Sequence, residues 1–178
     1  MRVIAGSFAG RKLLGPKKQR IRPTSDRVRE SLFAILGDLV IGARFADLCA
    51  GTGSVGFEAL SRGAWHATFV EKAHGAVALL RKNVETLGLS SNQVDVWITD
   101  VTRLTRPIEP WNIVFIDPPY HLTEKIVYRL VKRDILDNEP LVIVEHGGKE
   151  PVPIDELGLR LLDHRSYGQT SLTFLRKS

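Results

Sequence analysis

The sequence predicts an α/β protein with a doubly wound, mostly parallel sheet of seven strands that ends in an antiparallel hairpin. From residue 43 onward, short apolar stretches alternate with longer amphipathic stretches, as is typical of parallel sheets with helices on both faces. A glycine-rich turn at residues 51–56 joins the first strand of this series to its first helix. The last two strands, 160–165 and 171–176, are separated by only five residues, so we expect them to pair as a hairpin.

A small extension is predicted before this series. Residues 2–6 and 11–14 are extended candidates on either side of a turn with a glycine at each end, which favours a β-hairpin. Residues 15–23 form a loop with two prolines. A helix capped by Thr24 or Ser25 then ends at Gly37, and its apolar face consists of Val28, Leu32, Phe33, Ile35 and Leu36. We therefore divide the chain into an extension, residues 1–37, and a main domain, residues 38–178.

The main domain follows the alternation closely. Before the terminal hairpin we expect strands at 45–49, 66–70, 94–98, 112–116 and 141–145, with helices at 54–62, 73–87 and 123–133. Residues 112–116 and 141–145 are nearly continuous apolar runs, which indicates strands that are buried on both faces.

Composition excludes several classes of protein. Cys49 is the only cysteine, so the chain has no internal disulfide and no cysteine-rich metal site. The five histidines lack the spacing of metal ligands. No apolar run approaches the roughly 20 residues of a membrane span, and the first residues turn polar too early for a secretory signal. We expect a monomeric, cytoplasmic protein with no metal and no membrane partner.

The net charge of +5 is unevenly distributed along the chain. Residues 1–30 carry a charge of +7 and the remainder carries −2. Such an asymmetry favours a polyanionic partner, because neutralised phosphates release counterions. A solvated basic surface is the alternative reading. The candidate phosphate ligands are Arg2, Arg11, Lys12, Lys17, Lys18, Arg20, Arg22, Arg27 and Arg29, and we expect those of the helix to face away from its apolar stripe.

The glycine turn has the G-x-G-x-x-G spacing that lets a nucleotide-like ligand approach the backbone at the start of a helix. By itself the spacing also fits a NAD enzyme. Asp47, four residues before the first glycine, disfavours a pyrophosphate and favours a cationic ligand such as S-adenosylmethionine. The candidate cofactor residues of this turn are Asp47, Cys49, Ala50, Gly51, Thr52, Gly53 and Gly56.

Acidic residues end the next two strands, where ligands of open α/β sheets bind. Glu71, twenty residues after Gly51, could accept hydrogen bonds from both ribose hydroxyls. Asp100 could receive the exocyclic amine of adenine. One such acid alone is more often a helix cap or a solvated turn. The succession of Asp47, Glu71, Asp100 and Asp117 at strand ends favours a nucleoside site.

Asp117, Pro118, Pro119 and Tyr120 form the most specific motif. Two consecutive prolines fix a rigid turn with free carbonyl acceptors. The Asp117 carboxylate and the Pro118 carbonyl could each accept one N–H of an aromatic amine and aim its nitrogen at a methyl donor. The nitrogen becomes acidic during transfer, so an ordinary carboxylate could take its proton. Tyr120 could stack on an extruded base. The alternative is a Pro-Pro turn with a packed tyrosine.

The glycine turn and the Asp-Pro-Pro-Tyr motif together resemble S-adenosylmethionine-dependent amino-methyltransferases, whose Rossmann-like fold has the same terminal hairpin. Residues 2–6, 10–13 and 22–30 resemble the N-terminal signature of the RsmD family, and residues 50–63 and 167–170 are similar to its cofactor and C-terminal loops. The resemblance covers essentially the whole chain. It implies transfer of a methyl group to the N2 amine of a guanine in 16S ribosomal RNA, with the RNA or a small-subunit particle as partner.

The choice of guanine comes from the resemblance alone. The residues by themselves also allow an adenine-N6 methyltransferase that acts on RNA or DNA. Rivals from other classes are a NAD-dependent reductase and a non-catalytic RNA-binding module.

Overall fold

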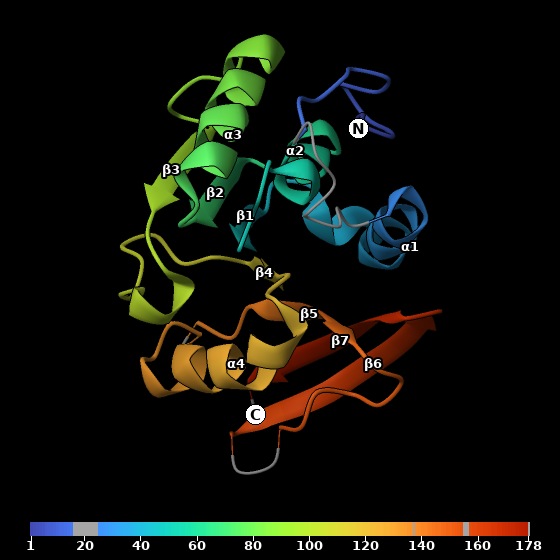
Figure 1. Cartoon of the computed structure of the whole chain (residues 1–178), viewed down its shortest axis with the longest axis vertical. Coiled ribbons are helices and arrows are strands. Elements are labelled where there is room, and N and C mark those ends of the chain that lie inside the picture. Colours follow the sequence, from blue (N-terminus) through green and yellow to red (C-terminus); the bar gives the residue numbers. More distant parts are fainter. Residues whose placement is uncertain (16–24, 137, 155–156, 178) are drawn as a thin grey trace.

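The computed structural model describes residues 1–15, 25–136, 138–154 and 157–177. It contains one seven-stranded sheet in the order β3-β2-β1-β4-β5-β7-β6 (Figure 1). Strands β1 to β5 are parallel, and β7 runs antiparallel to both β5 and β6. The strands are β1 (Arg44–Leu48), β2 (His66–Glu71), β3 (Val94–Ile98), β4 (Ile113–Ile116), β5 (Leu141–Gly147), β6 (Leu159–Tyr167) and β7 (Thr170–Lys177). The predicted fold class is confirmed.

The α-helices are α1 (Asp26–Leu36), α2 (Ser54–Ser61), α3 (His74–Leu87) and α4 (Thr123–Lys132). Short 3₁₀ turns are η1 (Gly37–Val40), η2 (Val101–Arg103) and η3 (Tyr120–Leu122). Within the described part of the chain, no helix is long and apolar enough to cross a membrane.

Alternate side chains of each strand point to opposite faces of the sheet. Both faces are buried, because helices pack against each of them. Phe45, Phe115 and Ile143 pack into one core with apolar residues of α1, α2 and α3. Val114 and Val144, which point the other way, pack into a second core with α4. Figure 1 shows α4 set apart from the other three helices. This alternation decides which side chains at the strand ends lie on the same face of the sheet.

The predicted N-terminal hairpin forms, but its antiparallel pairing is short. Arg2 and Lys12 make a bridge, and Val3 donates to the Arg11 carbonyl at 3.0 Å and accepts from the Gly10 N–H at 2.9 Å. The backbone N–H groups of Ile4 and Ala5 donate instead to the Glu58 carboxylate of α2, at 2.7 and 3.0 Å. These bonds hold the residues that follow the paired stretch against α2. A side chain more than fifty residues away determines this conformation.

A second anchor ties the N-terminal segment to the rest of the fold. The fully buried Asn83 of α3 accepts from the Leu14 N–H at 2.7 Å and donates to the carbonyls of Leu14 and Thr52, both at 3.1 Å. Because Thr52 belongs to the glycine turn, this amide connects the N-terminal segment directly to the candidate cofactor loop. Side chains of α1 also join the core of the main domain. The boundary at residues 37 and 38 stays a prediction.

Arg29 is fully buried, which corrects the expectation that it faces away from the apolar stripe of its helix. It lies three and four residues before Leu32 and Phe33 and so shares their face. Its Nη2 donates to the Arg2 carbonyl at 2.7 Å and pairs with Asp26 at 3.0 Å. Its Nε lies 3.7 Å from Glu58. Burial lowers its pKa, although these carboxylates oppose that shift. Arg29 therefore links the N-terminal segment to α1 and is not a surface ligand for phosphate.

Replacing Glu58 by Gln should destabilise the protein strongly. The change leaves Arg29 without its buried counter-charge, and breaking a buried pair costs about 3–5 kcal/mol. The free energy of unfolding from urea titration measures this loss. Glu85→Gln on the exposed side of α3 is the matched control, with an expected change within about 0.5 kcal/mol. A Glu58→Gln variant as stable as this control would contradict the proposed anchoring role.

Candidate active site

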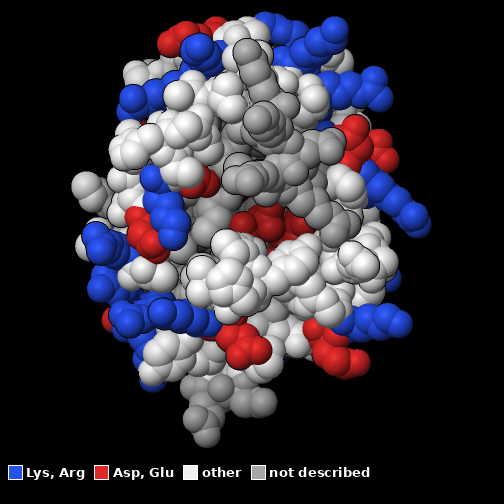
Figure 2. All heavy atoms as spheres, in the orientation of Figure 1, with Lys and Arg blue, Asp and Glu red and all other residues white. Residues whose placement is uncertain are grey.

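A pocket of about 1000 Å³ opens at the carboxyl ends of the parallel strands. Figure 2 shows a hollow near the centre of one face with acidic atoms at its base. The structure brings most of the predicted residues together here. Those that line the pocket are Asp47, Cys49, Ala50, Gly51, Thr52, Glu71, Asp100, Asp117, Pro118, Pro119 and Tyr120.

Gly53 and Gly56 are not among the lining residues, so their contact with the cofactor stays a prediction. A Cβ atom on Gly56 would lie 2.3 Å from the Phe69 ring of β2, and one on Gly53 would lie 2.6 Å from the Phe57 ring. These glycines therefore let α2 pack closely on the sheet. Gly51, which does line the pocket, has a φ of +56°.

Asp47 is the most deeply buried of the carboxyl groups that line the pocket, with 2% of its surface exposed. One of its oxygens accepts a hydrogen bond from the Gly56 N–H at 2.9 Å. Burial raises its pKa to about 7, and the charges of Glu71 and Glu145 add to this effect while the Gly56 bond opposes it. A cation placed beside Asp47 would favour its ionised form.

Cys49, two residues after Asp47, has a left-handed φ of +65°. Burial raises the pKa of its thiol to about 12, so it lines the pocket as a neutral group and not as a nucleophile.

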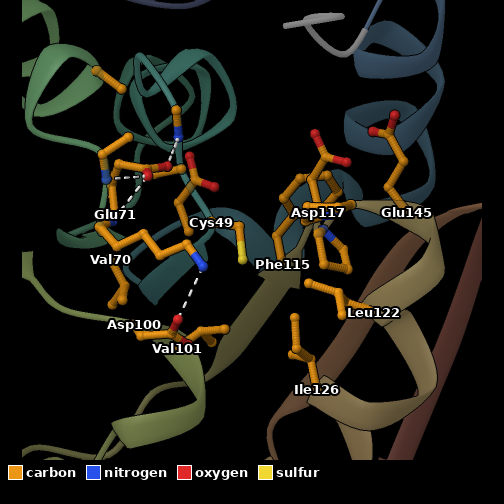
Figure 3. Close-up of a pocket in the computed structure, with 18 of the residues that line it drawn as sticks. Cys49, Val70, Glu71, Asp100, Val101, Phe115, Asp117, Leu122, Ile126 and Glu145 are labelled. Carbon is orange, nitrogen blue, oxygen red and sulfur yellow. Dashed lines mark hydrogen bonds and ion pairs between the residues drawn. The ribbon is translucent and has the colours of Figure 1, made fainter.

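Glu71 connects the end of β2 to the glycine turn. One oxygen accepts from the Gly51 N–H at 2.8 Å, and the other accepts from the N–H groups of Lys72 and Ala73 at 2.8 and 2.7 Å (Figure 3). Each carboxylate oxygen can accept more than one donor, so these bonds leave room for the predicted ribose contact.

Asp100 accepts from the N–H and hydroxyl of Thr102 at 2.9 and 2.8 Å, and from Lys72 Nζ at 3.0 Å. The bond from the Thr102 N–H, followed by those from the Lys72 ammonium and the Thr102 hydroxyl, lowers its pKa to about 2. Lys72, to which the sequence assigned no function, therefore connects the ends of β2 and β3. The adenine contact of Asp100 stays a prediction.

The Asp117–Tyr120 turn is held from both sides. The Asp117 N–H donates to the Leu48 carbonyl at 3.2 Å, which ties β4 to β1. The Tyr120 hydroxyl lies 3.2 Å from the Thr170 hydroxyl, and its ring covers Gly147 so closely that a Cβ there would lie 2.5 Å away. Tyr120 keeps 41% of its surface exposed. One part of the ring is anchored while the rest stays accessible for stacking.

The pKa of Asp117 is raised well above its usual value by burial and by the charges of Glu145 and Asp47. A carboxylate with an ordinary pKa would suffice to accept the amine proton. The raised pKa makes this carboxylate a stronger proton acceptor.

Sequence reasoning missed two groups of pocket residues. Glu145 ends an apolar strand just as Asp117 follows one. Its position at a strand end could therefore have identified it as a pocket residue. The other group is basic and consists of Arg103, two α4 residues and the residue that caps this helix. Lys125, Arg129 and the C-cap Arg133 are spaced four residues apart, which places them on one side of α4. In Figure 2 basic side chains gather over α4 beside the hollow.

The predicted phosphate ligands divide into three groups. Arg2, Arg11, Lys12 and Arg27 are exposed. Arg29 is buried, as described above. Lys17, Lys18, Arg20 and Arg22 lie outside the described residues. Among the described residues, no group of histidine, cysteine and acidic side chains has the arrangement of a metal site.

The fold and the pocket define a methyltransferase of the Rossmann-like class. A solved Escherichia coli methyltransferase matches with a TM-score of 0.85 and 34% identity over 99% of this chain and 97% of that one. The magnesium protoporphyrin IX methyltransferase of Synechocystis, solved with bound S-adenosylmethionine, has a TM-score of 0.67 over 85% of this chain and 79% of its own; at 13% identity it supports the fold alone.

Closer relatives identify the family. The family model described as conserved hypothetical protein 95 matches residues 1–176. Ribosomal RNA small subunit methyltransferase D of Escherichia coli is 38% identical over 86% of this chain and 78% of its own. The Haemophilus influenzae protein of that name is 37% identical over 85% and 81%. The chain belongs to this family, the RsmD family, which confirms the resemblance seen in the sequence.

Proposed function

We propose that this chain transfers a methyl group from S-adenosylmethionine to the N2 amine of a guanine in 16S ribosomal RNA. The observation that carries the proposal is that the glycine turn and the Asp117–Tyr120 turn line one pocket. Relatives named small-subunit ribosomal RNA methyltransferases support the substrate class. A monomer acting in the cytoplasm, on naked RNA or on a small-subunit particle, is part of the same proposal.

The acidic lining fits a cationic nucleoside better than a dinucleotide. Asp47, Glu71 and Asp100 line the cofactor side of the pocket, and a pyrophosphate there would meet carboxylates. S-adenosylmethionine carries two positive groups and no phosphate, and when bound it supplies an electrophilic methyl group. Asp47 would face its methionine end, and Glu71 and Asp100 its adenosine. This charge argument disfavours the NAD-dependent reductase.

The chain's own residues then orient the acceptor and remove its proton. The amine of a base is a poor nucleophile because its lone pair is conjugated with the ring. The Asp117 carboxylate and the Pro118 carbonyl would each accept one of its N–H groups and direct the nitrogen lone pair toward the methyl group. As the new N–C bond forms, the nitrogen becomes acidic and its proton passes to Asp117. Tyr120 would stack on the base.

The rate of transfer at saturating substrates should rise with pH. Asp117 accepts a proton only when it is ionised, and its raised pKa keeps it protonated at low pH. The rate therefore increases as pH passes through that pKa and levels off above it. Glu145→Gln removes a charge that opposes ionisation, so it should move this midpoint to lower pH. If wild-type protein and Glu145→Gln have the same midpoint, the charge of Glu145 does not raise the pKa of Asp117 and the account is wrong.

RNA phosphates should contact the exposed cations Arg2, Arg11, Lys12 and Arg27 as well as the basic residues of α4 beside the pocket. Replacing both Lys125 and Arg129 by Glu should weaken RNA binding and flatten its dependence on salt, by about 1.5 in log–log slope for two lost contacts. Filter binding at several salt concentrations measures this slope. The control is Arg160→Glu with Arg176→Glu, an exposed cross-strand pair on the β6–β7 hairpin. Equal slopes in the two variants would exclude α4 from the RNA interface.

The proposed substrate can be tested with ribosomes from a strain that lacks the gene. Purified protein and methyl-labelled S-adenosylmethionine are added to separated small and large subunits and to their extracted RNAs. The label should enter one nuclease fragment of 16S RNA. Label in large-subunit RNA or in no RNA would overturn the proposal.

A further inference from the structure

Asp117 and Glu145 are side by side at the ends of neighbouring strands. The parallel register of β4 and β5 pairs Ile116 with Val144, so the next residue of each strand occupies adjacent positions. Both acids share the sheet face of Phe115 and Ile143, because side chains alternate along a strand. Figure 3 shows the two carboxyl groups close together and pointing the same way. Glu145 is only 5% exposed, and both residues line the pocket.

Two carboxylates that face one volume repel each other, and the Glu145 charge is one cause of the raised pKa of Asp117. A ligand that presents adjacent hydrogen-bond donors relieves that repulsion, whereas a ligand that presents an acceptor increases it. The bases differ in this respect. Guanine has an N1–H donor directly beside its N2 amine. Adenine has an acceptor at N1 and only a C–H at position 2.

We propose that Glu145 reads the target base by accepting a hydrogen bond from guanine N1–H, while Asp117 accepts one from the N2 amine. This inference rests on the proposed function and extends it by assigning the choice of guanine over adenine to a residue. Asp117 performs the chemistry, and Glu145 makes the pair of acceptors complementary to the guanine edge. A buried carboxylate beside the base selects against a base that presents an acceptor at this position, because two acceptors that face each other repel.

The test uses 2-aminopurine in place of the target guanine, in the RNA that the wild-type protein methylates. This base keeps the amine at C2 but has an acceptor at N1. Wild-type protein should methylate it about ten- to a hundredfold more slowly than guanine, the range expected for one base-specific contact. In Glu145→Gln the amide can donate to N1, so the preference for guanine should fall to a few-fold. Glu150→Gln, an exposed carboxylate beyond the same strand, should keep the wild-type preference.

Each outcome has a distinct meaning. If wild-type protein forms no N2-methylguanine, the proposed function fails. If it does, and Glu145→Gln keeps the wild-type ratio of guanine to 2-aminopurine rates while binding S-adenosylmethionine normally, only the assignment of Glu145 fails. A second measurement needs wild-type protein alone. RNA with inosine at the target keeps the N1–H and should bind more tightly than RNA with adenosine, and equal affinities would overturn the assignment.

Discussion

Replacing Asp117 by Ala should lower the rate of methyl transfer about 10²- to 10⁴-fold, the range that general acid–base catalysis contributes. The variant loses both an acceptor that orients the amine and the group that receives its proton. The affinity for S-adenosylmethionine should stay within about twofold of the wild-type value, because Asp47, Glu71 and Asp100 are unchanged. Single-turnover kinetics gives the rate, and isothermal titration gives the affinity.

Asp117→Asn provides the matched control for this variant. The amide oxygen can still accept one N–H of the base but cannot take its proton, so RNA binding should survive while transfer stays slow. Transfer by the alanine variant at the wild-type rate would remove Asp117 from the mechanism. A parallel loss of cofactor affinity would instead assign it to the cofactor site.

Replacing Asp47 by Asn should weaken S-adenosylmethionine binding about ten- to a hundredfold, the value of a charge-assisted contact. The pH dependence is more diagnostic. Asp47 has a pKa of about 7 without a cationic partner, and a bound cation favours its ionised form. Wild-type affinity should therefore rise between about pH 5 and pH 8, and that of the variant should be flat. Titration in buffers of different ionisation enthalpy detects the proton released on binding.

The same substitution should stabilise the ligand-free protein. The folded pKa of Asp47 is raised from its ordinary value of 3.8 to about 7, so the folded state is penalised as pH rises through that window. Asparagine removes the penalty and can still accept from the Gly56 N–H. We expect a gain of about 1–4 kcal/mol at pH 8 and almost none at pH 4. Asp38→Asn, at an exposed carboxyl, should change neither stability nor affinity. Weaker stability at pH 8 would contradict the burial argument.

The features that could be predicted from the sequence are those with a local cause. Short apolar runs that alternate with amphipathic stretches, glycines at fixed spacing and acids at strand ends were enough to predict the sheet. The same signals place four acids at one edge of it: Asp47, Glu71, Asp100 and Asp117. The parallel topology then brings strand ends together, so four residues far apart in sequence line one pocket.

What could not be predicted depends on contacts between distant segments. The N-terminal pairing covers only a few residues, and the next two backbone donors, Ile4 and Ala5, bind Glu58 of a distant helix. Gly53 and Gly56 are needed for packing on Phe57 and Phe69, which spacing alone cannot distinguish from ligand contact. Arg29 was wrongly predicted to be an exposed phosphate ligand, because a count of charges does not show which face of a helix each residue occupies.

The Asp117–Tyr120 motif likewise said nothing about which base is methylated. Glu145 belongs to no motif, and only the register of β4 and β5 shows that it lies beside Asp117. The structure therefore offers a physical reason for guanine that the sequence could not provide.

The most direct measurement is the identity of the methylated nucleoside. Small subunits from the deletion strain are incubated with the protein and S-adenosylmethionine that carries a trideuterated methyl group, and the RNA is digested and analysed by mass spectrometry. We predict that the deuterated label appears in N2-methylguanosine and disappears with Asp117→Ala. Labelled N6-methyladenosine, or no labelled nucleoside, would contradict the account.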